Sequence, residues 1–207
     1  MGIGVDIKSV LQELGTDVII HKLTGGTVTG EKVDTEVFTE TSSEWRRQHF
    51  VSVTFQYDTQ VSTSDVIEIN GEFYVVTSKD PSLFENEPVD YLCACFRCNC
   101  YGMFYRFTEN PGFDTNYEPL PQFVLQRDLV RAMFVEDLRN SEYKTIAGVS
   151  AEEIIAGHLY ISPYTDTLVG DRWYPDRTDL TEYYMVKLIQ RYRLSGTHVI
   201  SLVEDKR

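Results

Sequence analysis

The chain has 207 residues, a formal net charge of −13 and an aromatic content of 13%. This composition excludes a disordered chain and favours a β-rich globular protein of one or two domains. Thirty-two acidic residues against 19 basic ones argue against sequence-specific nucleic-acid binding. We expect no membrane contact either, because no apolar run approaches the ~20 residues of a membrane span and the N-terminus lacks the pattern of a signal peptide.

The first expected element is an amphipathic helix within residues 1–16. Its apolar positions recur every three or four residues: Ile7, Val10, Leu11 and Leu14. Residues 17–110 then alternate between apolar and polar side chains, which predicts five to seven strands. The dipeptide Asn70-Gly71 predicts a tight hairpin turn within this region. We expect a small antiparallel β-barrel or sandwich module, with 23–36 as a polar hairpin or surface loop.

Residues 111–157 are expected to form a linker followed by a helical segment. Prolines are frequent at its start, and an apolar stripe in 125–138 predicts a helix. A capping box of Ser150 and Glu153 predicts a second helix, which would end at Gly157. Residues 158–207 return to strand patterns and could pack into the same β core. The expected fold class is therefore mainly β with a few short helices (α+β).

An internal echo links the two halves of the chain. Asp65 and Asp171 each precede two large residues, a turn and a strand that contains tyrosine. Residues 73–75 would then match residues 183–185, although the spacing differs between the two copies. Two related β-modules would produce such an echo, and so would two unrelated hairpins that obey the same local rules.

All four cysteines lie in the segment CACFRCNC: Cys93, Cys95, Cys98 and Cys100. Four close thiols could hold a metal ion or form a redox centre. However, the spacing C-x-C-x2-C-x-C on one strand would place the first pair and the second pair on opposite faces, whereas a zinc site needs four convergent ligands. Buried cysteine also packs as a small apolar residue. We therefore favour core packing, expect neither metal nor cofactor, and keep the four thiols as the candidate metal ligands.

No pattern of a catalytic centre is found in the sequence. The motif G-x-S-x-G and phosphate-binding glycine loops are missing, and the four histidines are scattered: His21, His49, His158 and His198. Carboxylates are plentiful, but no spacing singles out an acid–base pair. We expect a protein that is not an enzyme, with no catalytic residues, and whose strands, aromatic residues and loops serve in an assembly.

The segment 64–107 resembles neck proteins of tailed bacteriophages, the head–tail connector or head-closure family. The residues that carry the resemblance are Asp65, Val66, Ile67, Tyr74, Val75, Cys98, Asn99 and Phe104 to Arg106. The C-terminal stretch, GDRWYP followed by YYMVKLIQRYRLSGTHVISLVED, is similar to the terminal strands of such proteins. The resemblance covers roughly half of the chain, which is about twice as long as the small head-closure proteins.

The resemblance implies a structural virion protein at the head–tail interface, assembled in the host cytoplasm. It would form a six- or twelve-fold ring, with the portal or an adaptor above and a tail protein below. Double-stranded DNA would only pass through, because an acidic wall repels phosphates. The segments 23–36 and 78–88 would be docking or gate elements. A tail terminator, a baseplate adaptor and a thiol metal-binding protein remain as alternatives.

Overall fold

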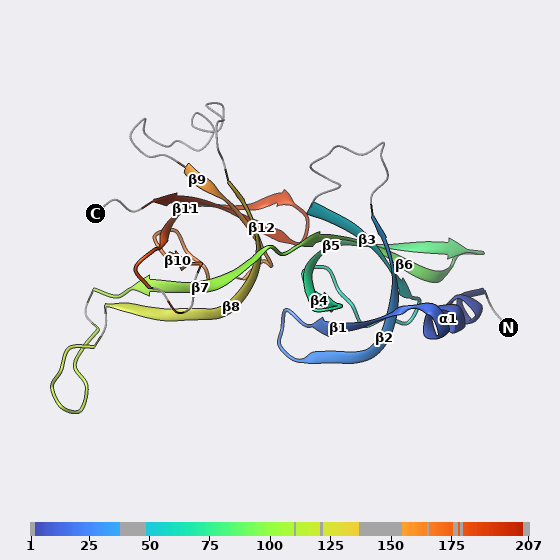
Figure 1. The fold of residues 1–207 in the computed structure, drawn as a ribbon, viewed down its shortest axis with the longest axis horizontal. Coiled ribbons are helices and arrows are strands. Elements are labelled where there is room, and N and C mark those ends of the chain that lie inside the picture. The colour runs from blue at the N-terminus through green and yellow to red at the C-terminus, as the bar shows by residue number, and fades with distance from the viewer. Residues whose placement is uncertain are drawn as a thin grey trace. The chain divides into compact units, whose positions relative to one another are not determined.

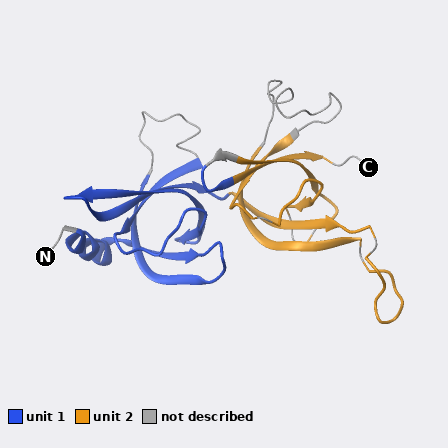
Figure 2. Ribbon diagram, turned by 180° about the vertical axis from the view of Figure 1, so that it is seen from behind, with its two compact units in different colours: residues 1–98, 194–197 blue, residues 99–193, 198–207 orange. Residues whose placement is uncertain are grey.

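The computed structural model describes residues 3–37, 49–109, 111–120, 122–136, 155–164, 166–175, 178 and 180–204. The chain divides into two compact units, which are coloured separately in Figure 2. Unit 1 comprises residues 1–98 and 194–197, and unit 2 comprises residues 99–193 and 198–207. The predicted mainly β fold is confirmed, because every described element except one helix is a strand (Figure 1).

Unit 1 is a closed antiparallel barrel with one helix outside it. Its elements are α1 (Ile3–Leu14), β1 (Thr16–His21), β2 (Thr27–Val37), β3 (Phe50–Gln56), β4 (Val66–Ile69), β5 (Glu72–Phe84) and β6 (Glu87–Arg97). The strand order is β1-β2-β3-β6-β5-β4, and β4 closes on β1. The Asn-Gly turn joins β4 to β5 as predicted, with positive φ at both of its residues.

Unit 2 is a second closed antiparallel barrel. Its elements are β7 (Cys100–Phe107), β8 (Phe123–Glu136), β9 (Ile155–Ile161), β10 (Arg172–Tyr174), β11 (Tyr184–Leu194) and β12 (Thr197–Glu204). The order is β7-β8-β9-β12-β11-β10, and β10 closes on β7. Each strand of unit 2 therefore takes the place of the strand six positions earlier. The echo in the sequence reflects a repeat of the whole barrel topology.

Packed side chains fill the interior of each barrel. The core of unit 1 comprises Val18, Ile20, Val33, Val53, Phe55, Val61, Ile67, Ile69, Val76, Cys93 and Cys95. The core of unit 2 comprises Phe104, Val130, Ala132, Leu159, Ile161, Trp173, Val186, Ile200 and Leu202. Except for Val61, which lies between β3 and β4, these are the alternate, inward-facing residues of the strands, as expected for barrels of this size. The described side chains therefore leave neither interior as an open channel.

Helix α1 packs on the barrel of its own unit. It contacts β2, β3 and β6, and Leu11 is the side chain that it buries most completely. Gly4 lies close to Val89 of β6, where an added Cβ would be 3.4 Å from the Val89 Cα. The predicted helix is confirmed, but only part of its expected apolar stripe packs on the barrel: Leu11 is buried, whereas Val10 and Leu14 are 55% and 82% exposed.

Two predictions of helices were wrong. The predicted helix in 125–138 is, up to Glu136, the long strand β8. Gly157 does not end a helix, because it lies inside β9, while Ser150 and Glu153 lie outside the described residues. The segment 23–36, for which we expected a polar hairpin or surface loop, is the turn and second strand of the β1–β2 hairpin, so the first alternative is confirmed. The described β8 and β9 therefore replace the helical segment proposed for 111–157, and the units divide after Cys98 rather than near residue 110.

Candidate interaction surfaces

Three of the four cysteines belong to or pack against the two barrel cores. Cys93 and Cys95 face the interior of unit 1 and are fully buried, whereas Cys100 packs against the core of unit 2. Cys98 is partly buried and ends unit 1. Within the described part of the chain, no three His, Cys, Asp or Glu side chains are grouped so that they could hold a metal ion. The arrangement suits packing better than metal binding.

Burial also makes these thiols poor nucleophiles. Desolvation raises the pKa of Cys93 to about 12 and that of Cys100 to about 11, and it raises the pKa of Cys95 well above its usual value. We expect iodoacetamide to modify Cys93 and Cys95 in the native protein at least about a hundredfold more slowly than in the urea-unfolded chain, because only the thiolate reacts. Peptide mass spectrometry would measure this ratio, and rapid native labelling of Cys93 would contradict it.

Metal analysis gives a second, independent test of the cysteine segment. If the thiols pack rather than bind zinc, the purified protein should carry only trace zinc, and Cys98→Ser should change the free energy of unfolding by less than about 1 kcal/mol. About one zinc per chain, lost together with folding in that variant, would show the opposite.

The described histidines do not converge on one site. His21 Nε2 lies 3.3 Å from Glu68 Oε2 on the surface of unit 1, and His158 Nδ1 lies 3.2 Å from Ser201 Oγ in unit 2. Burial, reinforced by the charge of Arg191, lowers the pKa of His198. Each contact joins neighbouring strands, which is a structural role. That the chain is not an enzyme remains a prediction.

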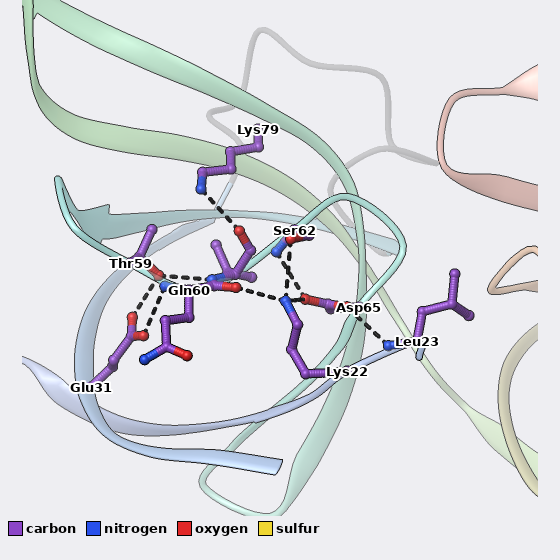
Figure 3. Close-up of polar contacts among 9 residues, drawn as sticks. Lys22, Leu23, Glu31, Thr59, Gln60, Ser62, Asp65 and Lys79 are labelled. Carbon is purple, nitrogen blue, oxygen red and sulfur yellow. Dashed lines mark hydrogen bonds and ion pairs between the residues drawn. The ribbon is translucent and has the colours of Figure 1, made fainter. Parts of the chain in front are cut away.

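A buried carboxylate organises the end of the unit 1 barrel (Figure 3). Asp65 accepts hydrogen bonds from the backbone N–H groups of Ser62, at 2.8 Å, and Leu23, at 3.0 Å. Its Oδ2 also accepts one from Lys22 Nζ at 2.5 Å. The backbone N–H of Ser64, whose φ is 79°, donates to Val76. Asp65 thereby fixes the turn that leads into β4.

Further hydrogen bonds fix the connection between β3 and β4, as Figure 3 also shows. Glu31 accepts a hydrogen bond from Thr59 Oγ1 at 2.5 Å and another from the backbone N–H of Gln60 at 3.0 Å. Lys79 Nζ donates to the carbonyl of Val61, whose side chain is part of the core. This connection therefore covers one end of the barrel, and these hydrogen bonds hold it in place.

Unit 2 repeats the carboxylate turn. Asp171 accepts hydrogen bonds from the backbone N–H of Leu168 at 2.7 Å and from Arg106 through Nε and Nη2, at 2.9 and 3.0 Å. Gly170 takes the place of the positive-φ residue before it, with φ of 90°. The cations occupy similar places, since Lys22 directly follows β1 and Arg106 is the penultimate residue of β7. These acids hold the fold together and are not free to act as ligands.

The hairpin of β5 and β6 extends beyond the barrel (Figure 1). We call residues 80–90 the ribbon tip. Its turn, Glu85-Asn86, has positive φ at both residues, and the two strands stay paired up to Phe84 opposite Glu87. Leu83 and Phe84 are exposed, the latter at 49%. The tip contains four acidic residues and no basic one. It includes most of the segment 78–88 that the sequence suggested for docking.

Unit 2 has an extended connection of its own in residues 108–122. Asp114 Oδ1 accepts hydrogen bonds from the backbone N–H groups of Asn116 and Glu118, both at 2.8 Å. Tyr117 has a φ of 62° and is 87% exposed, and Phe113 is also exposed. Positive φ is uncommon for a bulky residue. The loop therefore displays aromatic side chains on an ordered backbone.

The outer surface of β7, β8 and β10 forms an aromatic face. We define it by Tyr101, Phe107, Phe123, Leu125, Arg131 and Arg172. Phe104 and Trp173 point inward to the core, so their strand neighbours point outward. Tyr105 pairs with Arg172 on one side and with Leu125 on the other, which places these side chains in one row. The sequence analysis did not predict this face, because residues 125–138, which include most of β8, were expected to form a helix rather than a strand.

Arginine side chains stack on the rings of the aromatic face. The Arg172 guanidinium lies 3.5 Å from the ring centre of Phe123 and 4.0 Å from that of Tyr183. Arg131 lies 5.0 Å from the ring centre of Tyr101. Such stacking holds a cation on an apolar surface. The face therefore combines apolar area with positive charge.

Comparisons with known proteins add little to this geometry. No family model matches the chain, and no curated protein matches it. A solved structure of K. pneumonia MrkH is similar at a TM-score of 0.23 and 11% sequence identity, over 99% of this chain and 84% of that chain. A likeness this weak carries no argument about fold or function. No described helix is both long and apolar enough to cross a membrane. The interpretation therefore depends on the ribbon tip, the loop 108–122 and the aromatic face.

Proposed function

We propose that the chain is a structural protein of the neck of a tailed bacteriophage, where it forms a ring between portal and tail. The observation that carries the proposal is the exposed apolar surface, in both units, on backbone that is held by hydrogen bonds. Phe84 of the ribbon tip and Tyr117 of the loop 108–122 are held by backbone hydrogen bonds but covered by little of the chain itself. Exposed apolar groups on rigid elements are typical of contact sites between proteins.

The packed interiors of the barrels determine where DNA could pass through such a ring. Because side chains fill both interiors, DNA would pass through the centre of the ring and outside each barrel. The charge of −13 would keep phosphates from binding to the wall. The connection that closes the unit 1 barrel is fixed by hydrogen bonds and would not serve as a gate.

Light scattering with the portal complex of the same phage tests the proposal. We expect the mass of the portal complex to rise by six or twelve chains of 23.9 kDa. Immunogold labelling of intact virions should mark the junction of head and tail. Labelling along the tail or at its far end would support a tail terminator or baseplate adaptor instead. A chain that ignores the portal and is missing from virions would contradict the proposal.

A further inference from the structure

We propose that the ribbon tip of one copy docks on the aromatic face of a second copy, so that the contact repeats from head to tail. This inference rests on the ring of the proposed function and names the surfaces that would build it. A contact between two different surfaces generates a ring when its rotation closes. If either surface bound only a second copy of itself, the other surface would stay exposed.

The two surfaces are complementary in charge. The ribbon tip carries Asp80, Glu85, Glu87 and Asp90 and no basic residue, whereas the charged side chains among the residues that define the aromatic face are Arg131 and Arg172. The guanidinium groups of Arg131 and Arg172 stack on aromatic rings, so their positive charges lie against the protein instead of extending into the solvent. Opposite charges across an interface steer association and suppress wrong partners.

The formal charges of the two units also favour contact between the ribbon tip of one copy and unit 2 of another. Unit 1 has 16 acidic and 7 basic residues, and unit 2 has 16 acidic and 12 basic residues. Their formal charges are therefore −9 and −4. Basic side chains pair within both units: Lys8, Lys22, Lys79 and Arg97 in unit 1, and Arg106 and Arg127 in unit 2. Contact between two copies of unit 1 would be repulsive, so unit 2 is the more favourable partner for the tip.

The apolar residues of the two surfaces also match. Leu83 and Phe84 project from the tip, while Tyr101, Phe107 and Leu125 are each between 40% and 50% exposed on the aromatic face. Apolar centres with a charged rim are the usual composition of specific interfaces, in which aromatic and arginine side chains dominate the energy. The ribbon is narrow and paired to its end, so it can present Phe84 without refolding.

Sedimentation velocity of single variants tests each surface. At about 100 µM protein we expect the wild type to self-associate and to dissociate as salt is raised, because the contact is partly electrostatic. Phe84→Asp and Leu125→Asp should each weaken self-association at least about tenfold. Both side chains are exposed, so circular dichroism and thermal melting should match the wild type. Leu14→Asp, at an 82% exposed apolar residue of α1, is the control that should leave assembly unchanged.

Mixing the two defective variants tests the head-to-tail geometry. Phe84→Asp retains an intact face and Leu125→Asp an intact tip, so an equimolar mixture should form a dimer under conditions in which each variant alone associates at least about tenfold more weakly than the wild type. A mixture that stays monomeric, a wild type that stays monomeric, or variants that assemble normally would each overturn the contact. Virion labelling and portal binding of the wild type test the neck proposal separately, and their results do not depend on whether the ribbon tip contacts the aromatic face.

Discussion

Replacing Asp171 by alanine is expected to lower the free energy of unfolding of unit 2 by about 3–4 kcal/mol. The side chain of Asp171 is only 1% exposed, and it accepts a bidentate hydrogen bond from Arg106 and one from the backbone N–H of Leu168. The substitution removes the carboxylate that the Arg106 guanidinium contacts, leaving that group only its hydrogen bond to the carbonyl of Asp166, and it leaves the N–H of Leu168 without its acceptor. Loss of the buried partner of such a pair costs more than the pair itself contributes.

The equivalent substitution Asp65→Ala should destabilise unit 1 by a similar amount, because Lys22 and two backbone N–H groups lose the same acceptor. Hydrogen exchange measured by mass spectrometry would separate the units, with faster exchange in β1–β6 for this variant and in β7–β12 for Asp171→Ala. Asp65→Asn, which keeps the shape but not the charge, should have a smaller effect.

A surface pair provides the matched control for both variants. Arg97 pairs with Glu72 on the exposed surface of unit 1, so Arg97→Ala should change stability by about 0.5 kcal/mol or less. If the two buried aspartates behaved like this pair, they would not be organising the turns. If Asp171→Ala increased exchange equally in both barrels, the two units would not unfold independently.

The strands of unit 1 were predictable because they follow simple rules. Alternation defined β3 through residues such as Val53 and Phe55, and the Asn-Gly turn fixed the register of β4 and β5. The echo between Asp65 and Asp171 was visible because the same turn chemistry is needed at the same place in both barrels. Local rules were sufficient wherever a strand was regular.

Strand β8 was mistaken for a helix because its pairing is irregular. Gly102 pairs with Val130, and Phe104, two residues later, pairs with Arg127, so β8 contains an extra residue opposite β7. A second shift follows next to it, and Leu129 has a φ of 51°. Bulges move the apolar positions off period two. The resulting apolar spacing of three and four residues is also the spacing of an amphipathic helix. The pattern of a single sequence therefore does not distinguish the bulged strand from a helix.

The candidate surfaces were only partly predictable. The segment 78–88 was named as a docking or gate element through the resemblance, but its paired geometry was not predicted. The aromatic face depends on which of two alternating rows points outward, and that is decided by the core of unit 2. A shift of one residue would exchange the two rows. The face therefore required the register of β7, β8 and β10.

Substitution of Gly102 by alanine is expected to destabilise unit 2 by about 3 kcal/mol, the upper end for overpacking. An added Cβ would meet the carbonyl oxygen of Tyr174 and would lie 2.6 and 2.7 Å from two ring carbons of Trp173. The carbonyl belongs to the backbone of β10, so the strand itself would have to move. Gly4→Ala is the matched control, because its nearest contact is a tyrosine ring carbon at 3.3 Å.

The repeat explains why glycine stands at this position. Phe104 pairs with Trp173 where Ile20 pairs with Ile67 in unit 1, so Gly102 corresponds to Val18, two residues before Ile20. Unit 1 fills this part of its core with two medium-sized side chains, and unit 2 with one large ring and no side chain.

A double-mutant cycle would measure this exchange of volume. Trp173→Ile alone should cost about 3 kcal/mol, because it leaves a cavity. Combined with Gly102→Ala, it should cost at least about 1 kcal/mol less than the sum of the single effects, because the new methyl group enters the space of the ring. Recovery should stay incomplete, since the carbonyl of Tyr174 still opposes the methyl group. Strict additivity of the two effects would mean that ring and glycine are not coupled, and that the backbone of β10 alone requires the glycine.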